Sequence, residues 1–418
     1  MRARWTFLAF LPLIIVPSAA HATSTVVPDQ FSTIQGAIDS GADSIFVRAG
    51  VYPESLSLTG PRALISLPTD SYGGPSLALP YVTALSWSCN WDNILRGFCF
   101  KHGVTTSGGG GLQVEGCWFE AGLCCGNVGG YLQIWHNFIF GVATFMGGAK
   151  FDIAMNTIIG GTVSYNPIGD GRLHDNVVVG PAPVGIVAWS DANAVHNYVR
   201  GCATGIENHT EFSKAIENIV EDCSGTGIIC SGNYHMGVIG NTVRRCGGVG
   251  IDVGNGGGSG AEVTGNTVDS VGSIGIRVTG GSARLSGNTV RGAGGDGMLA
   301  VPAIPSTVTG NVVGRSAGRG IAVQSTFENT LTGNTSYANG AAGFDVSGAW
   351  YTSIHNNIAY GNGGYGLVWS GSGTLDLSCN DWCENDAGTV SRAEPGATLV
   401  IHGQDGSTLL VGTASPSN

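Results

Sequence analysis

Hydrophobic and polar positions alternate around an asparagine that recurs along the chain. The Asn returns every 19 to 25 residues and is usually followed by a branched or hydroxyl residue and then by an apolar one. Its positions are Asn137, Asn156, Asn176, Asn197, Asn218, Asn241, Asn266, Asn288, Asn311, Asn334, Asn357 and Asn380. A period of this length indicates one supersecondary unit stacked on copies of itself, so residues one period apart become vertical neighbours.

Each repeat has three apolar positions at fixed distances from its Asn. One lies three residues before the Asn, as Ile134 does, one lies two residues after it, as Ile139 does, and a third follows a Gly about ten residues after it, as Ile186 does. This spacing predicts three short inward-facing strands per repeat, separated by Gly- and Asn-rich turns. Leucine-rich repeats and the glycine-rich calcium-binding roll are excluded because their sequence repeats are missing. The pattern therefore predicts an all-β, right-handed parallel β-helix of about fourteen coils, in which stacked Asn side chains bond one another and the turn backbone.

The two ends of the chain differ from the repeats. Ser32-Thr33-Ile34-Gln35 has the form of a capping box and predicts a short helix through Ile38 that covers the open end of the core. Strands are expected at 44–47, 55–58, 398–402 and 408–411. We therefore divide the chain into a signal peptide (1–22), an N-terminal cap with its first strands (23–60), the coils (61–385), and closing strands with a polar tail from Ala414 (386–418).

Composition adds an expected location. Arg2 and Arg4 precede an apolar run that ends at Val16, and Ala20-His21-Ala22 fits a cleavage signal, so we expect a secreted or periplasmic protein of bacterial type. The run is too short to span a bilayer, and we expect no membrane span. Charged residues make up 11% of the chain and its net charge is −11, which disfavours nucleic acid as a partner. We expect a monomer with no cofactor.

The eleven cysteines leave two interpretations open. Cys202, Cys223 and Cys246 each lie five residues after a repeat Asn, so they should be stacked ~4.8 Å apart, a spacing that a disulfide accepts. One disulfide among the three and a stack of buried free thiols fit equally well. Cys379 with Cys383, or Cys124 with Cys125, could serve as metal ligands, but no His/Cys cluster has zinc spacing, and we expect no metal site.

Part of the chain resembles a known group of proteins. Residues 26–58, VVPDQFSTIQGAIDSGADSIFVRAGVYPESLSL, resemble the N-terminal segment of pectin-lyase-like β-helix proteins, and the Gly-Asn-Thr-Val units at 240, 265 and 287 resemble their generic repeats. That superfamily includes polysaccharide lyases, glycoside hydrolases, pectin esterases and adhesins. Gly50-Val51-Tyr52-Pro53-Glu54 is similar to the first strand of pectin methylesterases, but the catalytic Asp motifs that follow later in those enzymes are missing here. The Asn-Thr-Asp and Gly-His-Gly signatures of polygalacturonases are missing as well. The resemblance implies the fold and does not identify an activity.

The densest group of ionisable residues falls on two neighbouring repeats. Counting back from Asn156 and Asn176 places five of them outward, and the preceding repeat adds a polar and an aromatic side chain. The candidate catalytic residues are Asp152, Asp170, Arg172 and His174, and the substrate-binding candidates beside them are Gln133, Trp135 and Lys150. We expect Lys150 beside Asp170 and Asp152 beside Arg172. An acid/base pair, a guanidinium and an aromatic platform suit cleavage of a sugar polymer. The alternative is two structural ion pairs and an exposed His.

Two further outward columns carry charge. Glu207, Asp252 and Arg277 are also candidates for substrate binding, because Glu207 and Asp252 should lie two coils, or ~9.6 Å, apart, and an inverting glycosidase separates its carboxyls by roughly 6.5–9.5 Å. Ordinary solvated positions explain these residues equally well. Arg200, Glu221, Arg244, Asp269 and Arg291 alternate in sign at one position of successive coils and are expected to form a structural ladder of ion pairs.

The C-terminal coils contain a group of aromatic residues. Its members are Tyr337, Trp350, Tyr351, Tyr360, Tyr365 and Trp369. Tyr337 and Tyr360 are predicted vertical neighbours, and such rings stack either on sugars or on one another. Together these features predict an exported protein that binds a polysaccharide, and the sequence leaves open whether it also cleaves the polymer as a lyase or a glycoside hydrolase. The competing hypothesis is a non-catalytic adhesive or structural protein of the cell surface.

Overall fold

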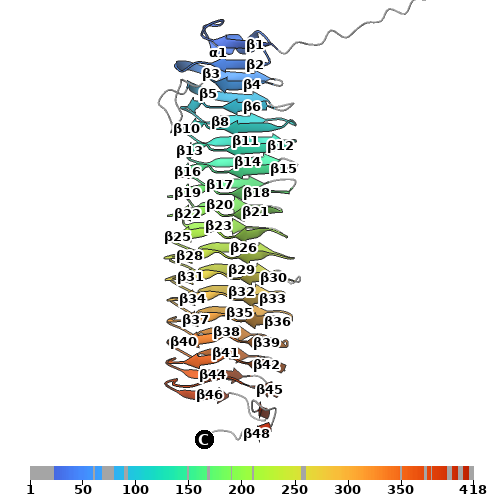
Figure 1. Cartoon of the computed structure of the whole chain (residues 1–418), viewed down its shortest axis with the longest axis vertical. Coiled ribbons are helices and arrows are strands. Elements are labelled where there is room, and N and C mark those ends of the chain that lie inside the picture. The colour runs from blue at the N-terminus through green and yellow to red at the C-terminus, as the bar shows by residue number, and fades with distance from the viewer. Residues whose placement is uncertain are drawn as a thin grey trace, which may run out of the picture.

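The computed structural model shows a tall stack of short parallel strands with one small helix at the N-terminal end (Figure 1). It describes residues 23–413 except 60–61, 68–79, 89–92, 148–149, 167–169, 190, 210, 256–259, 349–350, 371–373, 378, 393–397 and 403–407. The expected signal peptide and the tail from Ala414 lie outside the described residues. Each coil contributes one strand to each of three faces, and about fourteen coils do so, as the sequence predicted.

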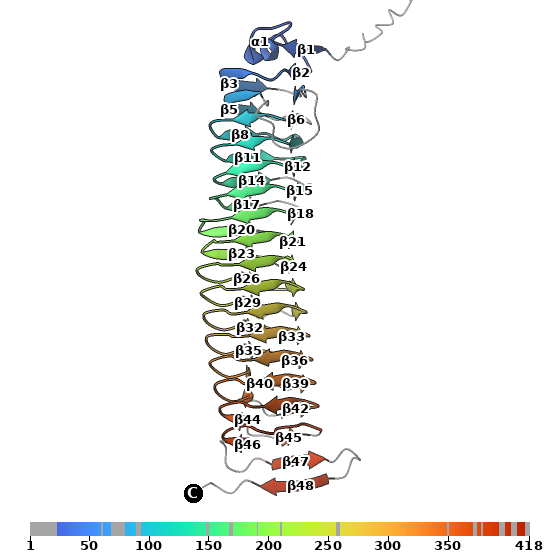
Figure 2. The same ribbon diagram turned by 60° about the vertical axis from the view of Figure 1, so that its left-hand side comes forward.

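The first face consists of the strands that precede the repeat Asn, and it forms a 19-stranded sheet. Its strands are β1 (Ser24–Val27), β2 (Ser44–Val47), β4 (Ala63–Ser66), β6 (Asn93–Arg96), β9 (Leu112–Glu115), β12 (Tyr131–Trp135), β15 (Lys150–Ala154), β18 (Asp170–His174), β21 (Ala192–Val195), β24 (Lys214–Ile216), β27 (Gly237–Ile239), β30 (Ala261–Thr264), β33 (Ala283–Ser286), β36 (Ser306–Thr309), β39 (Asn329–Thr332), β42 (Tyr351–His355), β45 (Thr374–Asp376), β47 (Thr398–His402) and β48 (Thr408–Thr413). Only β47 and β48 pair antiparallel within this sheet, and they lie at its C-terminal end (Figure 2).

The second face consists of short strands that follow the Asn. These are β7 (Cys99–Phe100), β10 (Trp118–Phe119), β13 (Phe138–Phe140), β16 (Thr157–Ile159), β19 (Val177–Val179), β22 (Tyr198–Arg200), β25 (Ile219–Glu221), β28 (Thr242–Arg244), β31 (Thr267–Asp269), β34 (Thr289–Arg291), β37 (Val312–Gly314), β40 (Thr335–Tyr337) and β43 (Ile358–Tyr360).

The third face completes each coil. It contains β8 (Val104–Ser107), β11 (Leu123–Val128), β14 (Ala143–Gly147), β17 (Val163–Asn166), β20 (Val184–Ala188), β23 (Thr204–Asn208), β26 (Ile228–Gly232), β29 (Ile251–Asn255), β32 (Ile276–Gly280), β35 (Met298–Pro302), β38 (Ile321–Gln324), β41 (Phe344–Ser347), β44 (Tyr365–Ser370) and β46 (Gly388–Arg392). The second and third faces are joined at their N-terminal end, because β5 (Tyr81–Ser88) pairs with both β7 and β8 and also with β3 (Val51–Thr59).

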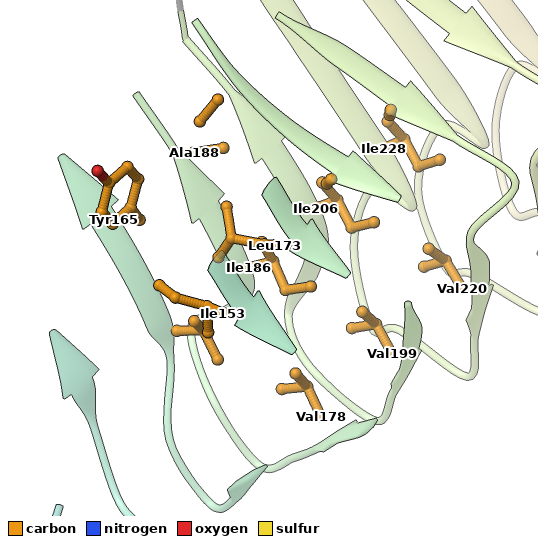
Figure 3. Packing of buried hydrophobic residues seen from close by; sticks show 14 of the residues in the cluster. Ile153, Tyr165, Leu173, Val178, Ile186, Ala188, Val199, Ile206, Val220 and Ile228 are labelled. Atoms are coloured by element: carbon orange, nitrogen blue, oxygen red, sulfur yellow. The ribbon is translucent and has the colours of Figure 1, made fainter. Parts of the chain in front are cut away.

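The core is made of the three apolar columns that the sequence predicted. Val178, Val199 and Val220 form one internal row, and Ile186, Ile206 and Ile228 form another (Figure 3). All six side chains are fully buried. Stacking the same residue type in successive coils buries apolar surface in every layer, which is the main favourable term in folding.

The Asn side chains form the predicted ladder at the corner between the first and second faces. Each Asn amide nitrogen donates to the Asn oxygen of the next coil and to a backbone carbonyl of the preceding coil, as Asn241 does to Asn266 (3.0 Å) and to Ala215 (2.8 Å). The same Asn266 oxygen accepts the backbone N–H of Asn241 at 2.9 Å. Polar groups at this buried corner are therefore satisfied by their own repeat.

A second, shorter ladder was not predicted. It lies five residues after the first, where Asn339, Asn362 and Asn385 continue the column that begins with Cys202, Cys223 and Cys246. Asn339 donates to Asn362 at 2.9 Å and Asn362 to Asn385 at 2.8 Å. The position that holds buried thiols in the upper coils thus holds hydrogen-bonded amides in the lower ones.

The N-terminal helix forms with a different cap from the one predicted. Helix α1 (Ile34–Asp39) begins after Thr33, whose side chain accepts the N–H of Gly36 at 3.1 Å, so the cap is Thr33 rather than Ser32. The reason lies in β3, where the Glu54 carboxylate accepts the N–H groups of Ile34 (3.0 Å) and Gln35 (2.8 Å). Glu54 thereby satisfies the free helix N–H groups and places a negative charge at the helix N-terminus.

Candidate functional site

The candidate catalytic residues come from β15 and β18 on the first face. The register places Lys150 opposite Asp170, Asp152 opposite Arg172, and Ala154 opposite His174, which agrees with the vertical neighbours expected from the sequence. Side chains in a strand alternate between the two sides, so Lys150, Asp152, Arg172 and His174 point outward while Ile153 and Leu173 fill the core. The side chain of Asp170 lies outside the described residues.

A groove runs along this face over several coils. Its volume is about 1190 Å³, and its lining includes Tyr131, Lys150, Asp152, Arg172, His174 and Lys214. It extends from β12 to His235, just before β27, which is five coil-to-coil steps of ~4.8 Å, or roughly 24 Å. The surface around His174 is therefore an elongated groove, which is the shape that binding of a polymer requires.

Asp152 and His174 make the central contact of the groove. His174 Nε2 lies 2.7 Å from Asp152 Oδ1, and the two side chains are 25% and 26% exposed. Asp152 and Arg172 are neighbours in register, as expected, but the hydrogen bond described for Asp152 is to the imidazole of His174, which reaches it diagonally from the end of β18. His174 Nδ1 lies 2.7 Å from Asp175, so an imidazolium ion can donate to a carboxylate on each side, whereas a neutral ring can donate to only one.

The same corner continues the series into the next two coils. His196 Nδ1 lies 3.9 Å from Asp175 Oδ1, and its Nε2 lies 2.5 Å from Glu217 Oε2. Carboxylates and imidazoles thus alternate from Asp152 to Glu217. The sequence analysis missed Asp175, His196 and Glu217, although all three stand immediately before a repeat Asn and that column could have been inspected directly.

The groove also gathers basic side chains. The chain has three lysines, and Lys150 and Lys214 both line the groove together with Arg172. Among the side chains that the structure describes, none forms an ion pair with these three. Asp152 and Asp191 also line the groove, so three basic side chains stand against two carboxylates. This small positive excess in an acidic protein favours an anionic ligand there.

Aromatic rings border the groove at both ends. Tyr131 is exposed on β12, and Phe212 is exposed in the turn before β24, where it stacks on His235 with centroids 5.6 Å apart. Exposed rings of this kind pack against the apolar faces of sugars. Gln133 and Trp135 share β12 with Tyr131, but neither lines the groove, and Trp135 is half-buried with its Nε1 unbonded within the described part of the chain.

The second predicted group lies on a different face. Glu207, Asp252 and Arg277 belong to β23, β29 and β32 of the third face, so they do not join the groove. Arg277 Nε donates to Asp252 at 2.8 Å and its terminal nitrogen donates to the other carboxylate oxygen, while Glu207 pairs with His209 at 2.9 Å. An Asp already bound by a guanidinium is a poor partner for an inverting pair, and Asp252 and Arg277 instead form an ion pair with each other.

The alternating charges of the second face form a network rather than a simple ladder. The register from Arg200 to Arg291 is as expected, but the ion pairs centre on Glu221 and Asp222. Glu221 is buried and accepts from Tyr198, Arg244 (2.5 Å) and Arg245 (2.7 Å). The Tyr198 hydrogen bond, and after it those of the two arginines, hold the pKa of Glu221 below its ordinary value against the opposing effect of burial.

Cys202, Cys223 and Cys246 are free thiols, which decides between the two interpretations. These three are buried, and burial raises the pKa of Cys202 to about 11.

No cluster of three or more His, Cys, Asp or Glu side chains suited to a metal ion occurs within the described ranges. No helix in those ranges is long and apolar enough to cross a membrane. In the C-terminal coils Tyr337 and Tyr360 stack as expected, with centroids 5.6 Å apart.

Comparison with known proteins supports the architecture. Residues 226–382 match the family model described as the right handed beta helix region. These residues form the lower coils of the parallel β-helix described above. The architecture implied by the resemblance to pectin-lyase-like proteins is thus confirmed. No protein in a search of curated sequences matched the chain.

Solved structures similar to this β-helix protein include three carbohydrate-active proteins. The A-module of the Azotobacter vinelandii mannuronan C-5 epimerase AlgE4 has 13% identity and a TM-score of 0.30, covering 88% of this chain and 94% of its own. The periplasmic alginate epimerase AlgG has 12% identity and a TM-score of 0.31, with coverages of 78% and 76%. The catalytic domain of a GH87 α-1,3-glucanase in complex with tetrasaccharides has 9% identity and a TM-score of 0.37, with coverages of 90% and 68%. Likeness at this level does not transfer an activity.

Proposed function

We propose that the first-face groove binds an anionic polysaccharide and that Asp152 with His174 cleaves it by a lyase-type reaction. The observation that carries the proposal is the combination, in one elongated groove, of three basic side chains with a bonded carboxylate–imidazole pair. Lys150, Arg172 and Lys214 would bind sugar carboxylates, and Tyr131 and Phe212 would stack on sugar rings.

The proposed chemistry follows from the contacts of the pair. His174 uses both ring nitrogens on carboxylates, whereas the hydrogen bond described for Asp152 uses Oδ1 alone, so Asp152 is the member whose other oxygen can face a substrate. Asp152 would remove the proton from the carbon next to a uronate carboxylate. A C=C bond would form as the glycosidic C–O bond on the adjacent carbon breaks, and the leaving oxygen would take a proton from the protonated Asp152 or from water. The neighbouring cations would stabilise the negative charge that develops on that carboxylate, and such preorganised charge is effective in a partly desolvated groove.

A second function, binding without cleavage, is favoured by one observation. Both nitrogens of His174 already have protein partners, so the imidazole needs no substrate to complete its hydrogen bonds. In that case the groove would serve an adhesive or structural β-helix protein of the cell surface.

The test measures binding to a panel of uronate polymers and the release of unsaturated ends. Replacing Lys150, Arg172 and Lys214 together by Ala should weaken binding roughly tenfold or more, since each exposed ion pair contributes up to ~1 kcal/mol. Lys101→Ala is the matched control, because Lys101 is the remaining lysine and is exposed outside the groove. The contribution of charge should also decrease with added salt.

Asp152→Asn separates the two functions. It keeps the size of the side chain but removes the base, so product release should fall by about 10²-fold or more while binding persists. If wild type binds these polymers but releases no product from any of them, the binding function stands and the cleavage proposal is wrong. If the triple variant binds as wild type does, the groove is not the binding site.

A further inference from the structure

Three polar side chains on the third face form a connected series outside the groove. His209 follows β23 and lies beside Ser231 of β26 in the next coil, with Nδ1 3.1 Å from the Ser231 hydroxyl oxygen. The other ring nitrogen, Nε2, lies 2.9 Å from Oε2 of Glu207, which is two residues earlier in the chain, in β23. The His209 and Glu207 side chains are mostly buried, with 25% and 20% of their surfaces exposed.

The protonation state of this series follows from its partners. A carboxylate only accepts hydrogen bonds, so Nε2 carries the proton that faces Glu207, and the lone pair of Nδ1 accepts from the Ser231 hydroxyl. A hydroxyl bonded to the unprotonated nitrogen of a His, whose other nitrogen is held by a carboxylate, is the arrangement that activates a serine nucleophile.

The surroundings hold the imidazole and leave room beside the hydroxyl. Trp189 of the preceding coil stacks on His209, with centroids 4.5 Å apart and planes 27° apart, and an aromatic face stabilises a ring that becomes cationic during proton transfer. In the following coil Gly254 stands opposite Ser231, and a Cβ there would meet no heavy atom within 4 Å. The Ser231 hydroxyl is therefore accessible on the side away from His209.

The neighbours of the accessible side of Ser231 favour a small apolar group. Ile229 lies on the same side of β26 as Ser231, two residues earlier, and offers an apolar contact. Asp252, on the same side of β29 as Gly254, is neutralised by Arg277, so that strand adds no unpaired carboxylate that would oppose an oxyanion formed beside Ser231. These contacts suit a small acyl group.

We propose that Ser231, His209 and Glu207 form a hydrolytic triad that removes small acyl groups from esters. The Ser231 oxygen attacks the acyl carbon while its proton passes to His209 Nδ1. The bond from the acyl carbon to the leaving alcohol then breaks, and the alcohol takes this proton. Water attacks the acylated serine with help from the same nitrogen, and the products are a carboxylic acid and free Ser231. Ser231 and His209 are the catalytic residues, and Glu207 is a positioning residue.

The experiment uses the full chain with p-nitrophenyl acetate as substrate and a fluorophosphonate probe as a covalent label. We expect turnover of the acetate and one probe adduct, located at Ser231 by peptide mass spectrometry. Ser231→Ala should abolish the adduct and lower turnover by about 10²-fold or more. Ser347→Ala is the matched control, because Ser347 occupies the corresponding outward position in β41 of a lower coil, where its vertical neighbours are Gln324 and Ser370. This control should behave as wild type does.

Two further variants separate chemistry from folding. His209→Gln should remove the adduct, and Glu207→Gln should lower kcat with KM unchanged, while both keep the circular dichroism of wild type. A wild-type protein that neither takes the probe nor turns over the ester overturns the proposal. So does an adduct at another residue, or an equal loss in Ser231→Ala and Ser347→Ala.

Discussion

Removal of one rung from the middle of the Asn ladder should destabilise the protein strongly. Asn266 is fully buried and takes part in four hydrogen bonds: its Nδ2 donates to Val238 (2.7 Å) and Asn288 (3.0 Å), and its Oδ1 accepts from the backbone N–H (2.9 Å) and side chain (3.0 Å) of Asn241. Asn266→Ala leaves the Val238 carbonyl and the Asn241 N–H without these partners in the interior.

The magnitude follows from those two backbone groups. A buried polar group without a partner costs about 1–3 kcal/mol, so two of them cost about 2–6 kcal/mol. Asn380→Ala, at the C-terminal end of the ladder, should cost about half as much or less, because Asn380 is only half-buried and water can replace its bonds. The exposed Asn233→Ala, which loses one weak contact of 3.5 Å to Glu211, should stay within about 0.5 kcal/mol of wild type.

The assay combines denaturant unfolding with amide hydrogen exchange. Since each coil contacts mainly its neighbours, the faster exchange should be confined to coils near residue 266, with the Asn241 amide affected most. Two results together would refute the argument: a midpoint for Asn266→Ala that corresponds to a loss of less than about 1 kcal/mol, and an Asn241 amide that keeps its protection.

Two further predictions concern the second face and the thiols. The folded-state pKa of Glu221 lies below its ordinary value, mainly because Tyr198 and the arginines bond its ionised form, so its stabilisation is complete above the ordinary Glu range and is lost as pH falls through the lowered value. The melting temperature should therefore drop below about pH 4, and it should drop less in Glu221→Gln, which is already less stable at neutral pH. Cys202, Cys223 and Cys246 are buried free thiols, so a thiol reagent should modify them only on unfolding; a purified chain in which two of them are oxidised would contradict the structure.

The fold could be predicted from the sequence because the coils repeat the same spacing of apolar and Asn positions. The spacing of Asn137, Ile134 and Ile139 recurs often enough that one register satisfies all coils, and a strand shifted by one residue would turn its apolar side chains outward. The cap was less predictable. Thr33 and Ser32 are both suitable caps, and the choice depends on Glu54, which reaches the helix from another strand.

The candidate sites could be predicted only in part, for a similar reason. Register placed Asp152 beside Arg172, but register describes Cα positions, and a side chain as long as His174 reaches a diagonal neighbour. The sequence did not indicate Ser231 and His209, because nothing in it distinguishes them from the other Ser and His residues of the coils. Their relation depends on ring orientation, which the sequence does not contain.

Backbone conformation adds a cost to the side chains that continue the series from His174. The residue before each ladder Asn adopts a left-handed conformation, and from Gly240 to Gly333 the lower coils use glycine there. In the groove coils the same position is occupied by Asp175, His196 and Glu217, with φ values of 54°, 53° and 51°. A non-glycine residue in this conformation costs roughly 1–2 kcal/mol. Glycine would relieve that strain but would remove the carboxylates and the imidazole that continue from His174. Non-glycine residues hold the same conformation at His136, Met155, Asn356 and Cys379, so the strain is a general feature of this corner. Asp175→Gly should therefore stabilise the backbone locally while freeing His174 Nδ1.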